Sequence, residues 1–197
     1  MSKILVDTID TRSGTSNITI GSSNASQITL KSGATLTNFP EGITVADQWR
    51  LTTNFNGDAQ PIASNLERVD SSGQGTIGTA MSESSGIFTF PSTGIYLVEF
   101  VAMATWTSTS FYHTSSIQLT TNNSSYTAVV EGDLAVTMGA DSGTWYSNAR
   151  AMTLVDVTDT SNVKVRFGID AYTGSPTTRG NSTVNLTYMT FIRLGDT

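Results

Sequence analysis

A chain of 197 residues has room for one all-β domain with an appendage, and its composition excludes several classes of protein. The absence of cysteine excludes a disulfide scaffold, a Cys-based metal site and a thiol nucleophile. His113 is the only histidine, which leaves little room for acid–base catalysis near neutral pH. A net charge of −6 argues against general affinity for nucleic acid, and no apolar run reaches the length of a membrane helix. We therefore expect a protein that has no enzymatic activity and no cofactor, binds no nucleic acid and does not insert into a membrane.

Small hydroxyl side chains dominate the sequence, with 25 serines and 33 threonines. A chain rich in threonine, valine, glycine and aromatic residues, and poor in lysine and glutamate, favours pleated sheet over helix. The hydrophobic share of 38% is too high for a disordered chain. No window shows the 3.6-residue periodicity of an amphipathic helix, so we predict an all-β protein.

The first 40 residues contain one aromatic side chain, Phe39, and consist of short β-type fragments separated by polar turns. Such a segment has too few large apolar residues for a core of its own. It must share a core with identical chains or dock on a larger surface. We predict an anchor or stalk at 1–40, a hinge at 41–48 that follows Pro40, and a knob domain at 49–197.

The strongest pattern lies between residues 87 and 106, where a short strand, a turn at 91–94 and a long strand from residue 95 are predicted. Both faces of the long strand are apolar, whereas a strand with one face in water alternates apolar and polar residues. One cover is the second sheet of a sandwich, and the other requires another copy of the chain. We therefore predict a homotrimer, with its interface at Tyr96, Val98, Phe100, Tyr188 and Phe191.

Further strands are expected along the rest of the knob. Residues 163–171 alternate cleanly, with Val165 and Phe167 on one face and Lys164 and Arg166 on the other. Residues 184–194 place Val184, Leu186, Tyr188, Ile192 and Leu194 together on one face. Other strands are predicted near 49–54, 60–69, 115–121, 126–138 and 145–157. About eight strands without a helix are typical of a sandwich or jelly roll.

Two parts of this pattern resemble a known superfamily. Residues 88–100 (FTFPSTGIYLVEF) resemble the central motif of the globular head of complement's first component and its tumour-necrosis-factor-like relatives. The closing strand, with Leu186-Thr187-Tyr188 and Phe191-Ile192-Arg193-Leu194, is similar to the last strand of that family. The resemblance covers roughly residues 46–197. It implies an antiparallel jelly-roll sandwich that trimerises about a three-fold axis and presents loops at its tip.

The N-terminal segment has a resemblance of its own. Residues 2–9 (SKILVDTI), the Gly/Ser/Thr-rich run after them and residues 36–40 (LTNFP) are similar to the start of structural proteins from tailed phages that infect marine cyanobacteria. This similarity implies that 1–40 anchors the knob to other virion proteins. It also implies that the protein is made in the host cytoplasm and ends in the virion. We assign the virion anchor to Ile4, Val6 and Ile9.

Aromatic side chains gather near predicted strand ends and are surrounded by serine, threonine and asparagine. Exposed rings in such surroundings suit sugar faces, although the same side chains can also form core or inter-subunit packing. We assign contacts with a host surface glycan or protein to five of these positions: Phe111, Tyr112, His113, Trp145 and Tyr146.

Acidic residues offer a competing hypothesis of glycoside cleavage, which needs two carboxyl groups about 5–5.5 Å or 6.5–9.5 Å apart. Candidates are Glu99, Glu131, Asp133, Asp141, Asp156 and Asp159. Glu99 lies on an apolar face, and we expect it to be an interface residue paired with an arginine such as Arg193 or Arg166. None of the acids follows the spacing of a calcium loop. We therefore assign no catalytic and no metal-binding residue.

The functional hypothesis is a phage virion structural protein, a trimeric fibre or knob that attaches to the host surface through multivalent loop contacts. Three alternatives stay open at this point. The chain could be a capsid or tail decoration protein that stabilises the particle, a fibre-borne glycan hydrolase, or a secreted bacterial adhesive head unrelated to phage.

Overall fold

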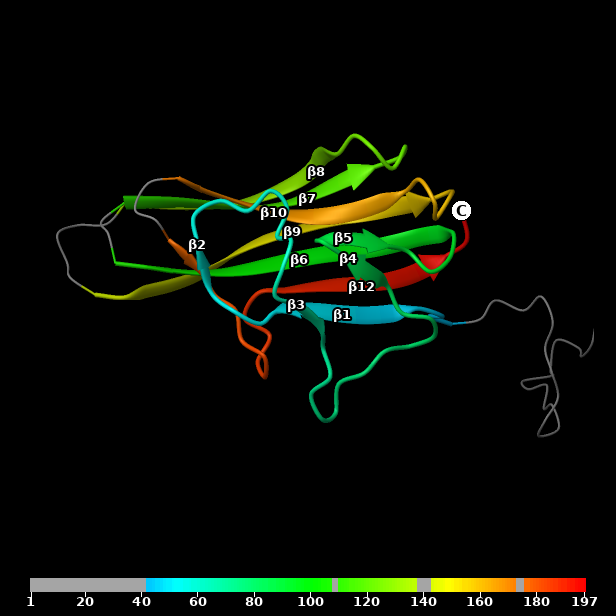
Figure 1. The fold of residues 1–197 in the computed structure, drawn as a ribbon, viewed down its shortest axis with the longest axis horizontal. Helices are drawn as coiled ribbons and strands as arrows, with labels where there is room; N and C mark the ends of the chain where they lie inside the picture. Colours follow the sequence, from blue (N-terminus) through cyan, green and yellow to red (C-terminus); the bar gives the residue numbers. More distant parts are fainter. Residues whose placement is uncertain (1–41, 108–109, 138–142, 173–175) are drawn as a thin grey trace, which may run out of the picture. The chain divides into compact units, whose positions relative to one another are not determined.

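The structure is a computed structural model that describes residues 42–107, 110–137, 143–172 and 176–197. These residues form a sandwich of two antiparallel sheets (Figure 1), and no helix occurs among them. The all-β jelly-roll architecture expected from the sequence is thus confirmed. The predicted stalk at 1–40, with Ile4, Val6 and Ile9, lies outside the described residues.

The first sheet contains seven strands of the described chain, and its longest pair is β6 and β9. Its order is β2-β11-β6-β12-β1-β3, and β9 pairs with β6 along its whole length. The strands are β1 (Ala46–Leu51), β2 (Phe55–Asn56), β3 (Leu66–Arg68), β6 (Gly94–Trp106), β9 (Trp145–Val157), β11 (Thr177–Thr178) and β12 (Tyr188–Gly195).

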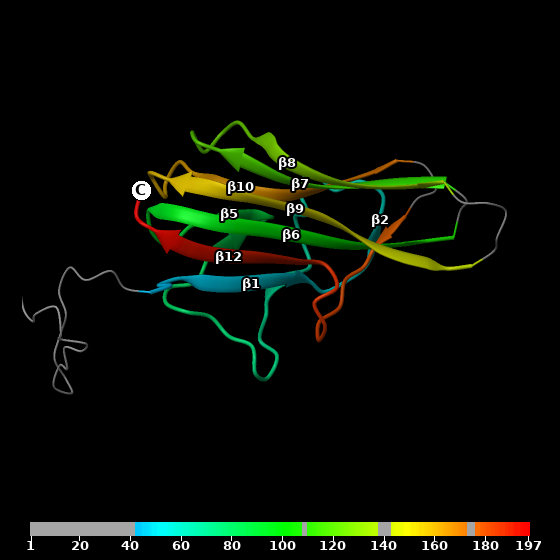
Figure 2. The same cartoon turned by 180° about the vertical axis from the view of Figure 1, so that it is seen from behind.

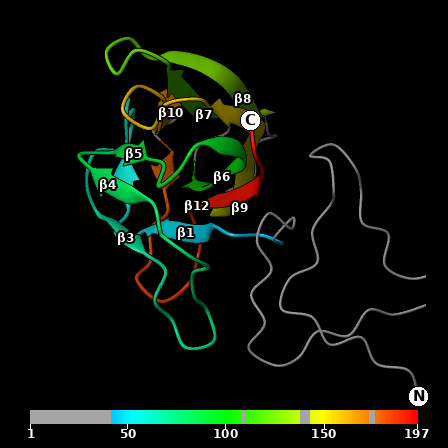
Figure 3. The same cartoon turned by 90° about the vertical axis from the view of Figure 1, so that its right-hand side faces the viewer.

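The second sheet contains five strands of the described chain in the order β4-β5-β10-β7-β8. They are β4 (Ser82–Ser84), β5 (Ile87–Thr89), β7 (Ser110–Thr120), β8 (Thr127–Thr137) and β10 (Lys164–Tyr172). Figure 2 shows the same arrangement from behind, and Figure 3, which looks along the strands, shows them as two curved layers.

The core between the sheets is aromatic. The ring of Phe88 on β5 lies 5.2 to 5.4 Å, between ring centroids, from the rings of Trp49, Phe167 and Phe191. Two of these contacts are edge-on, a geometry that aromatic pairs favour. Val165 and Phe167 are buried on the inner side of β10, as the alternation at 163–171 predicts. Because these strands each bury one face, the alternation fixes their orientation.

The closing strand starts later than predicted, and its core-facing side is the odd-numbered one. It begins at Tyr188, and Val184 lies before it with 54% of its surface exposed. Its inner face is formed by Met189 and Phe191, which lie opposite Phe100 and Val98 of β6. Side chains directly opposite each other share a face. The even-numbered apolar residues therefore point away from the core.

The predicted hinge at 41–48 is also too long. β1 begins at Ala46, and both Val45 and Asp47 are buried. The amide of Arg193 donates to the carbonyl of Val45 at 2.9 Å, so the chain is already fixed to β12 there. The sandwich therefore starts before residue 49.

The two sheets approach each other most closely between β8 and β9. Gly132 on β8 has no room for a side chain, because a Cβ atom there would overlap the backbone carbonyl of Arg150 on β9. This close approach holds β9 in place at the edge of the first sheet.

Candidate interaction surface

The outer face of the first sheet, which points away from the core, carries a row of apolar side chains. Leu154 on β9 lies opposite Leu97 on β6, which lies opposite Ile192 on β12, and Ala46 on β1 completes the row. Because opposite residues share a face, all four side chains point outward, together with the odd-numbered residues of β6. We call this row, with Met152 and Leu194 beside it, the apolar patch.

The next row along the same face is polar, and its groups are already paired. Glu99 on β6 lies opposite Met152 on one side and Thr190 on the other. Its carboxylate contacts the Nε atom of Arg150 at 2.6 Å. Gln48 on β1 donates from its Nε2 atom to the hydroxyl of Thr190 at 3.0 Å. The expected pairing of Glu99 with an arginine is confirmed, but the arginine is Arg150. The two examples named from the sequence contact other side chains, since Arg193 contacts Asp196 and Arg166 contacts Gln118.

Tyr188 lies in the third row, opposite Val101 on β6 and Arg50 on β1. Partial burial raises the pKa of Tyr188 above its ordinary value of 10.0, the nearby Glu99 raises it further, and Arg150 acts in the opposite sense. Arg50 is buried and contacts Glu67 and Asp70, each at 2.7 Å. The polar side chains nearest the apolar patch, Glu99, Gln48, Thr190 and Arg50, thus have partners within the chain.

The apolar patch is exposed in the single chain. Leu154, Leu194 and Met152 expose 61%, 55% and 48% of their surfaces. Scattered exposed apolar residues are normal on a protein surface, whereas a contiguous patch marks an interaction site. Both faces of the long strand are therefore apolar for separate reasons. One face packs in the core, and the other belongs to the apolar patch.

Four of the five residues predicted at the trimer interface are not on a surface. Tyr96, Val98, Phe100 and Phe191 have no exposed surface in the single chain and form the core between the two sheets. The prediction is wrong for these four, because the even-numbered face of β6 turns inward. Tyr188 alone among the five lies on the outer face. Leu97, Met152 and Leu154 were missed in the sequence. The odd-numbered face of 95–103 indicates Leu97, whereas Met152 and Leu154 join it through the pairing of β9 with β6.

The predicted contact residue His113 is inside the sandwich rather than in a loop. It lies within β7, has no exposed surface, and its Nε2 atom is 3.0 Å from the hydroxyl of Thr178. Burial lowers the pKa of His113 from 6.5 to about 4, outweighing an opposing hydrogen bond to its own backbone. His113 therefore cannot contact a receptor, because the alternation of β7 turns it toward the core.

The remaining predicted contact residues divide by exposure. Trp145 is partly buried and packs against Ala104 and Trp106. The hydroxyl of Tyr112 donates to Asp133 at 3.1 Å on β8. Tyr146 is 55% exposed, and of the predicted aromatic contacts its side chain is best placed to meet a ligand. The side chain of Phe111 lies outside the described part of the structure.

Arg179 packs against Tyr146, a contact that the sequence does not predict. The guanidinium of Arg179 lies over the Tyr146 ring, with its Cζ atom 5.5 Å from the ring centroid. Arg179 follows the two-residue strand β11 and continues that strand's pairing with β6. A strand of two residues has no periodicity to detect, which is why the sequence gives no indication of this contact.

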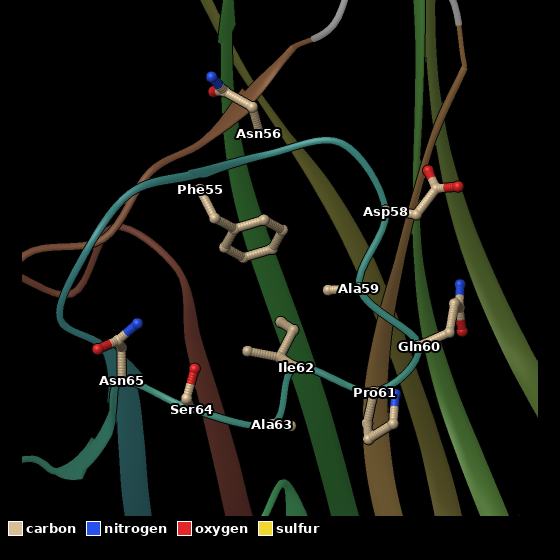
Figure 4. A pocket seen from close by; sticks show the side chains of 10 residues that line it. All are labelled: Phe55, Asn56, Asp58, Ala59, Gln60, Pro61, Ile62, Ala63, Ser64 and Asn65. Carbon is tan, nitrogen blue, oxygen red and sulfur yellow. The ribbon is translucent and has the colours of Figure 1, made fainter.

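The loop between β2 and β3 surrounds a hollow of about 470 Å³ (Figure 4). Phe55 and Ile62 point into the loop, whereas Asn56, Asp58 and Gln60 point away from it. Asp58 is used to hold the loop, because its carboxylate accepts from the amide of Ala171 at 2.8 Å. A ligand site needs converging polar groups, and this hollow has none among its side chains.

Asp141 lies outside the described residues, and the other acids considered for hydrolysis or calcium do not converge on a site. Glu131 and Asp133 lie on β8, where Asp133 accepts from the hydroxyl of Thr114 at 2.8 Å. Asp159 accepts from Ser161 and Asn162 within its own turn. In the described ranges, no three His, Cys, Asp or Glu residues lie close enough to hold a metal ion. The same ranges contain no helix that is long and apolar enough to cross a membrane.

The fold defined by these two sheets is a tumour-necrosis-factor-like jelly roll. A structure described as Eiger TNF from S. frugiperda matches 79% of this chain and 95% of its own, with a TM-score of 0.58 and 8% identity. The crystal structure of murine APRIL at pH 5.0 matches 76% of this chain and 98% of its own, with a TM-score of 0.52 and 11% identity. No family model and no curated protein matches the sequence. At these identities the similarity shows the fold alone.

Proposed function

We propose that the protein is a homotrimeric knob of a phage virion that attaches the particle to the host surface. The observation that carries the proposal is the apolar patch, which is exposed in one chain and flanked by polar groups that already have partners. The jelly-roll fold and the resemblance of the N-terminal segment to phage structural proteins support it.

A second copy of the chain is the occupant that best fits the apolar patch. Burying Glu99 together with Arg150 costs less than burying either charge alone, because their mutual attraction offsets part of the desolvation penalty of both. The amide and hydroxyl of Gln48 and Thr190 are likewise satisfied before docking. An identical chain can therefore cover Leu97, Leu154 and Ile192 without leaving an uncompensated charge.

The oligomeric state is the direct test. Light scattering on the full chain should give about three times the chain mass of 20.9 kDa. Leu154→Glu places a charge in the apolar patch and should yield a folded monomer. Val129→Glu is the matched control, because Val129 is 46% exposed on β8 of the other sheet. A wild-type monomer at micromolar concentration, or equal loss of mass in both variants, contradicts the proposal.

Attachment would be mechanical and adhesive, with no chemical step. Three copies present the same contact surface together, so weak individual contacts add up to strong binding. Purified knob should compete with infection of host cells, and the Leu154→Glu monomer should compete far less. A trimer that neither binds cells nor competes indicates the decoration alternative. Release of reducing sugars that is lost in Glu131→Gln or Asp133→Asn indicates a hydrolase.

The role of residues 1–40 is tested by deletion. We expect the chain without this segment to remain a soluble trimer that is not incorporated into particles, because Ile4, Val6 and Ile9 hold the knob to other virion proteins. Incorporation of the shortened chain contradicts the anchor assignment. The deletion leaves the apolar patch intact, so its result tests the anchor assignment independently of the oligomeric state.

A further inference from the structure

Arg179 differs from the other arginines that the structure describes in having no acceptor for its guanidinium. Four of them contact carboxylates and one donates to a glutamine side chain; these are Arg50, Arg68, Arg150 and Arg193, and then Arg166. The guanidinium of Arg179 instead lies over the ring of Tyr146. An unpaired cation on a chain of net charge −6 is a candidate for binding an anion.

The backbone register places Arg179 on the outer face of the first sheet. Thr177 and Thr178 lie opposite Thr105 and Ala104, and the amide of Arg179 donates to the carbonyl of Met103 at 2.8 Å. Arg179 therefore shares a face with Met103 and Thr105. Tyr146 lies on β9, at the far side of β6, so the arginine side chain crosses β6 to reach the ring.

Two polar atoms without partners lie at this crossing. The Nε atom of Arg179 and the hydroxyl of Thr105 are buried and make no hydrogen bond in the described structure. Thr105 lies opposite Tyr146 on one side and Thr177 on the other, so its side chain lies on the same outer face as that of Arg179. Because both atoms are covered in the single chain, an anion would meet the terminal nitrogens of the Arg179 guanidinium, which are not among these buried groups.

Tyr146 adds an exposed apolar surface to the cation. Its side chain is 55% exposed beside the guanidinium, and Asn148, also exposed, lies two residues further along the same face. A carboxylate matches the fork of an arginine, the apolar edge of a sugar matches a tyrosine ring, and an amide matches sugar hydroxyls. A guanidinium, a ring and an amide on one surface therefore fit a sugar that carries a carboxyl group.

We infer that Arg179, Tyr146 and Asn148 form a subsite for an acidic sugar of the uronate type. This inference rests on the proposed attachment function and names the chemistry of the ligand. Thr105 lies eight residues along β6 from Leu97 in the apolar patch, which is roughly 26 Å at the rise of a strand. The subsite and the contact between copies therefore occupy different ends of the same face.

The test measures binding of oligoglucuronate to the full chain by calorimetry, with the carboxyl-reduced neutral oligosaccharide of the same linkage as the comparison. Only the acidic sugar should bind. Arg179→Gln should weaken binding at least tenfold, and Tyr146→Leu several-fold. Arg166→Gln is the matched control, because this substitution removes the same charge. Arg166 also lies over a tyrosine, with its Cζ atom 4.3 Å from the Tyr126 ring centroid.

Four results of the binding measurements with the sugars and the variants would overturn the inference. They are equal binding of the neutral sugar, equal binding of polyglutamate, no loss in Arg179→Gln, and an equal loss in Arg166→Gln. Light scattering and competition with infection on the same samples separate this inference from the proposed function. A wild-type trimer that competes for cells but binds no uronate overturns the subsite alone. A loss of trimer mass in Arg179→Gln also overturns it, because Arg179 then serves the contact between copies.

Discussion

Arg150 on β9 contacts Glu99 on β6 at 2.6 Å, beside an apolar row of the outer face. In the single chain the side chain of Arg150 is 61% exposed and that of Glu99 is 18% exposed. An exposed ion pair contributes about 0–1 kcal/mol, whereas removing one partner of a buried pair costs about 3–5 kcal/mol. The energetic weight of this pair therefore depends on whether a second copy covers the face.

The first prediction follows from that difference. Glu99→Ala should lower the free energy of unfolding of the assembled protein by about 3 kcal/mol, because it leaves Arg150 uncompensated between copies. Replacing both residues, as in Glu99→Leu with Arg150→Met, should recover most of the loss. Denaturation at several protein concentrations measures both. A loss below about 1 kcal/mol in Glu99→Ala means that the pair stays in water.

The second prediction concerns acid stability. Burial lowers the pKa of His113 to about 4, whereas the unfolded chain titrates at about 6.5. The unfolded state therefore binds a proton first as the pH falls, and the folded state loses stability between pH 6.5 and 4. From pH 7.5 to pH 5 the expected loss is about 2 kcal/mol.

Urea denaturation at the two pH values measures this loss, and a variant isolates its source. His113→Gln should have a nearly flat pH dependence in this range, because His113 is the only histidine of the chain. Its stability at pH 7.5 should fall, since the fit in the core changes. An unchanged slope in His113→Gln assigns the effect to carboxyl groups instead.

The alternation of apolar and polar residues predicts which face of a strand is buried only where one of the two faces is polar. Residues 163–171 alternate between apolar and polar, and the structure buries the predicted face. In the strand at 95–106 both faces are apolar, so alternation alone does not say which face turns inward. The trimer residues were assigned to Tyr96, Val98 and Phe100 for that reason, although the second sheet already covers them.

Pairing between distant segments is the information that the sequence lacks. Met189 and Phe191 face the core because of their register against β6, about ninety residues earlier in the chain. Arg179 meets Tyr146 only because both segments pair with β6. Local patterns predict strands, but they do not predict which strands are neighbours.

The third prediction tests the close approach of β8 and β9. Gly132→Ala should lower the free energy of unfolding by about 1–3 kcal/mol or more, because the added methyl overlaps the Arg150 carbonyl and forces one strand to move. Gly75→Ala is the matched control, because a Cβ atom there meets nothing within 4 Å. Thermal denaturation compares the two variants. Equal melting temperatures contradict the packing of these strands.

The fourth prediction concerns Asp47, a carboxylate buried at the first strand. It accepts from the Trp49 Nε1 atom at 3.0 Å, from the Met81 amide at 2.9 Å and from the Arg68 Nε atom at 3.2 Å. Asp47→Asn keeps the shape but removes the charge that compensates Arg68, so the expected loss of stability is about 3 kcal/mol.

The control for Asp47 is an acid that is also paired with an arginine but lies in water. Asp70 contacts Arg50 with its own side chain 79% exposed, and Arg50 keeps Glu67 as a second partner. Asp70→Asn should therefore change the free energy of unfolding by no more than about 1 kcal/mol. Chemical denaturation of both variants distinguishes the sites. A loss in Asp70→Asn as large as that in Asp47→Asn means that the loop before β4, rather than the buried carboxylate, limits the stability of this end of the sandwich.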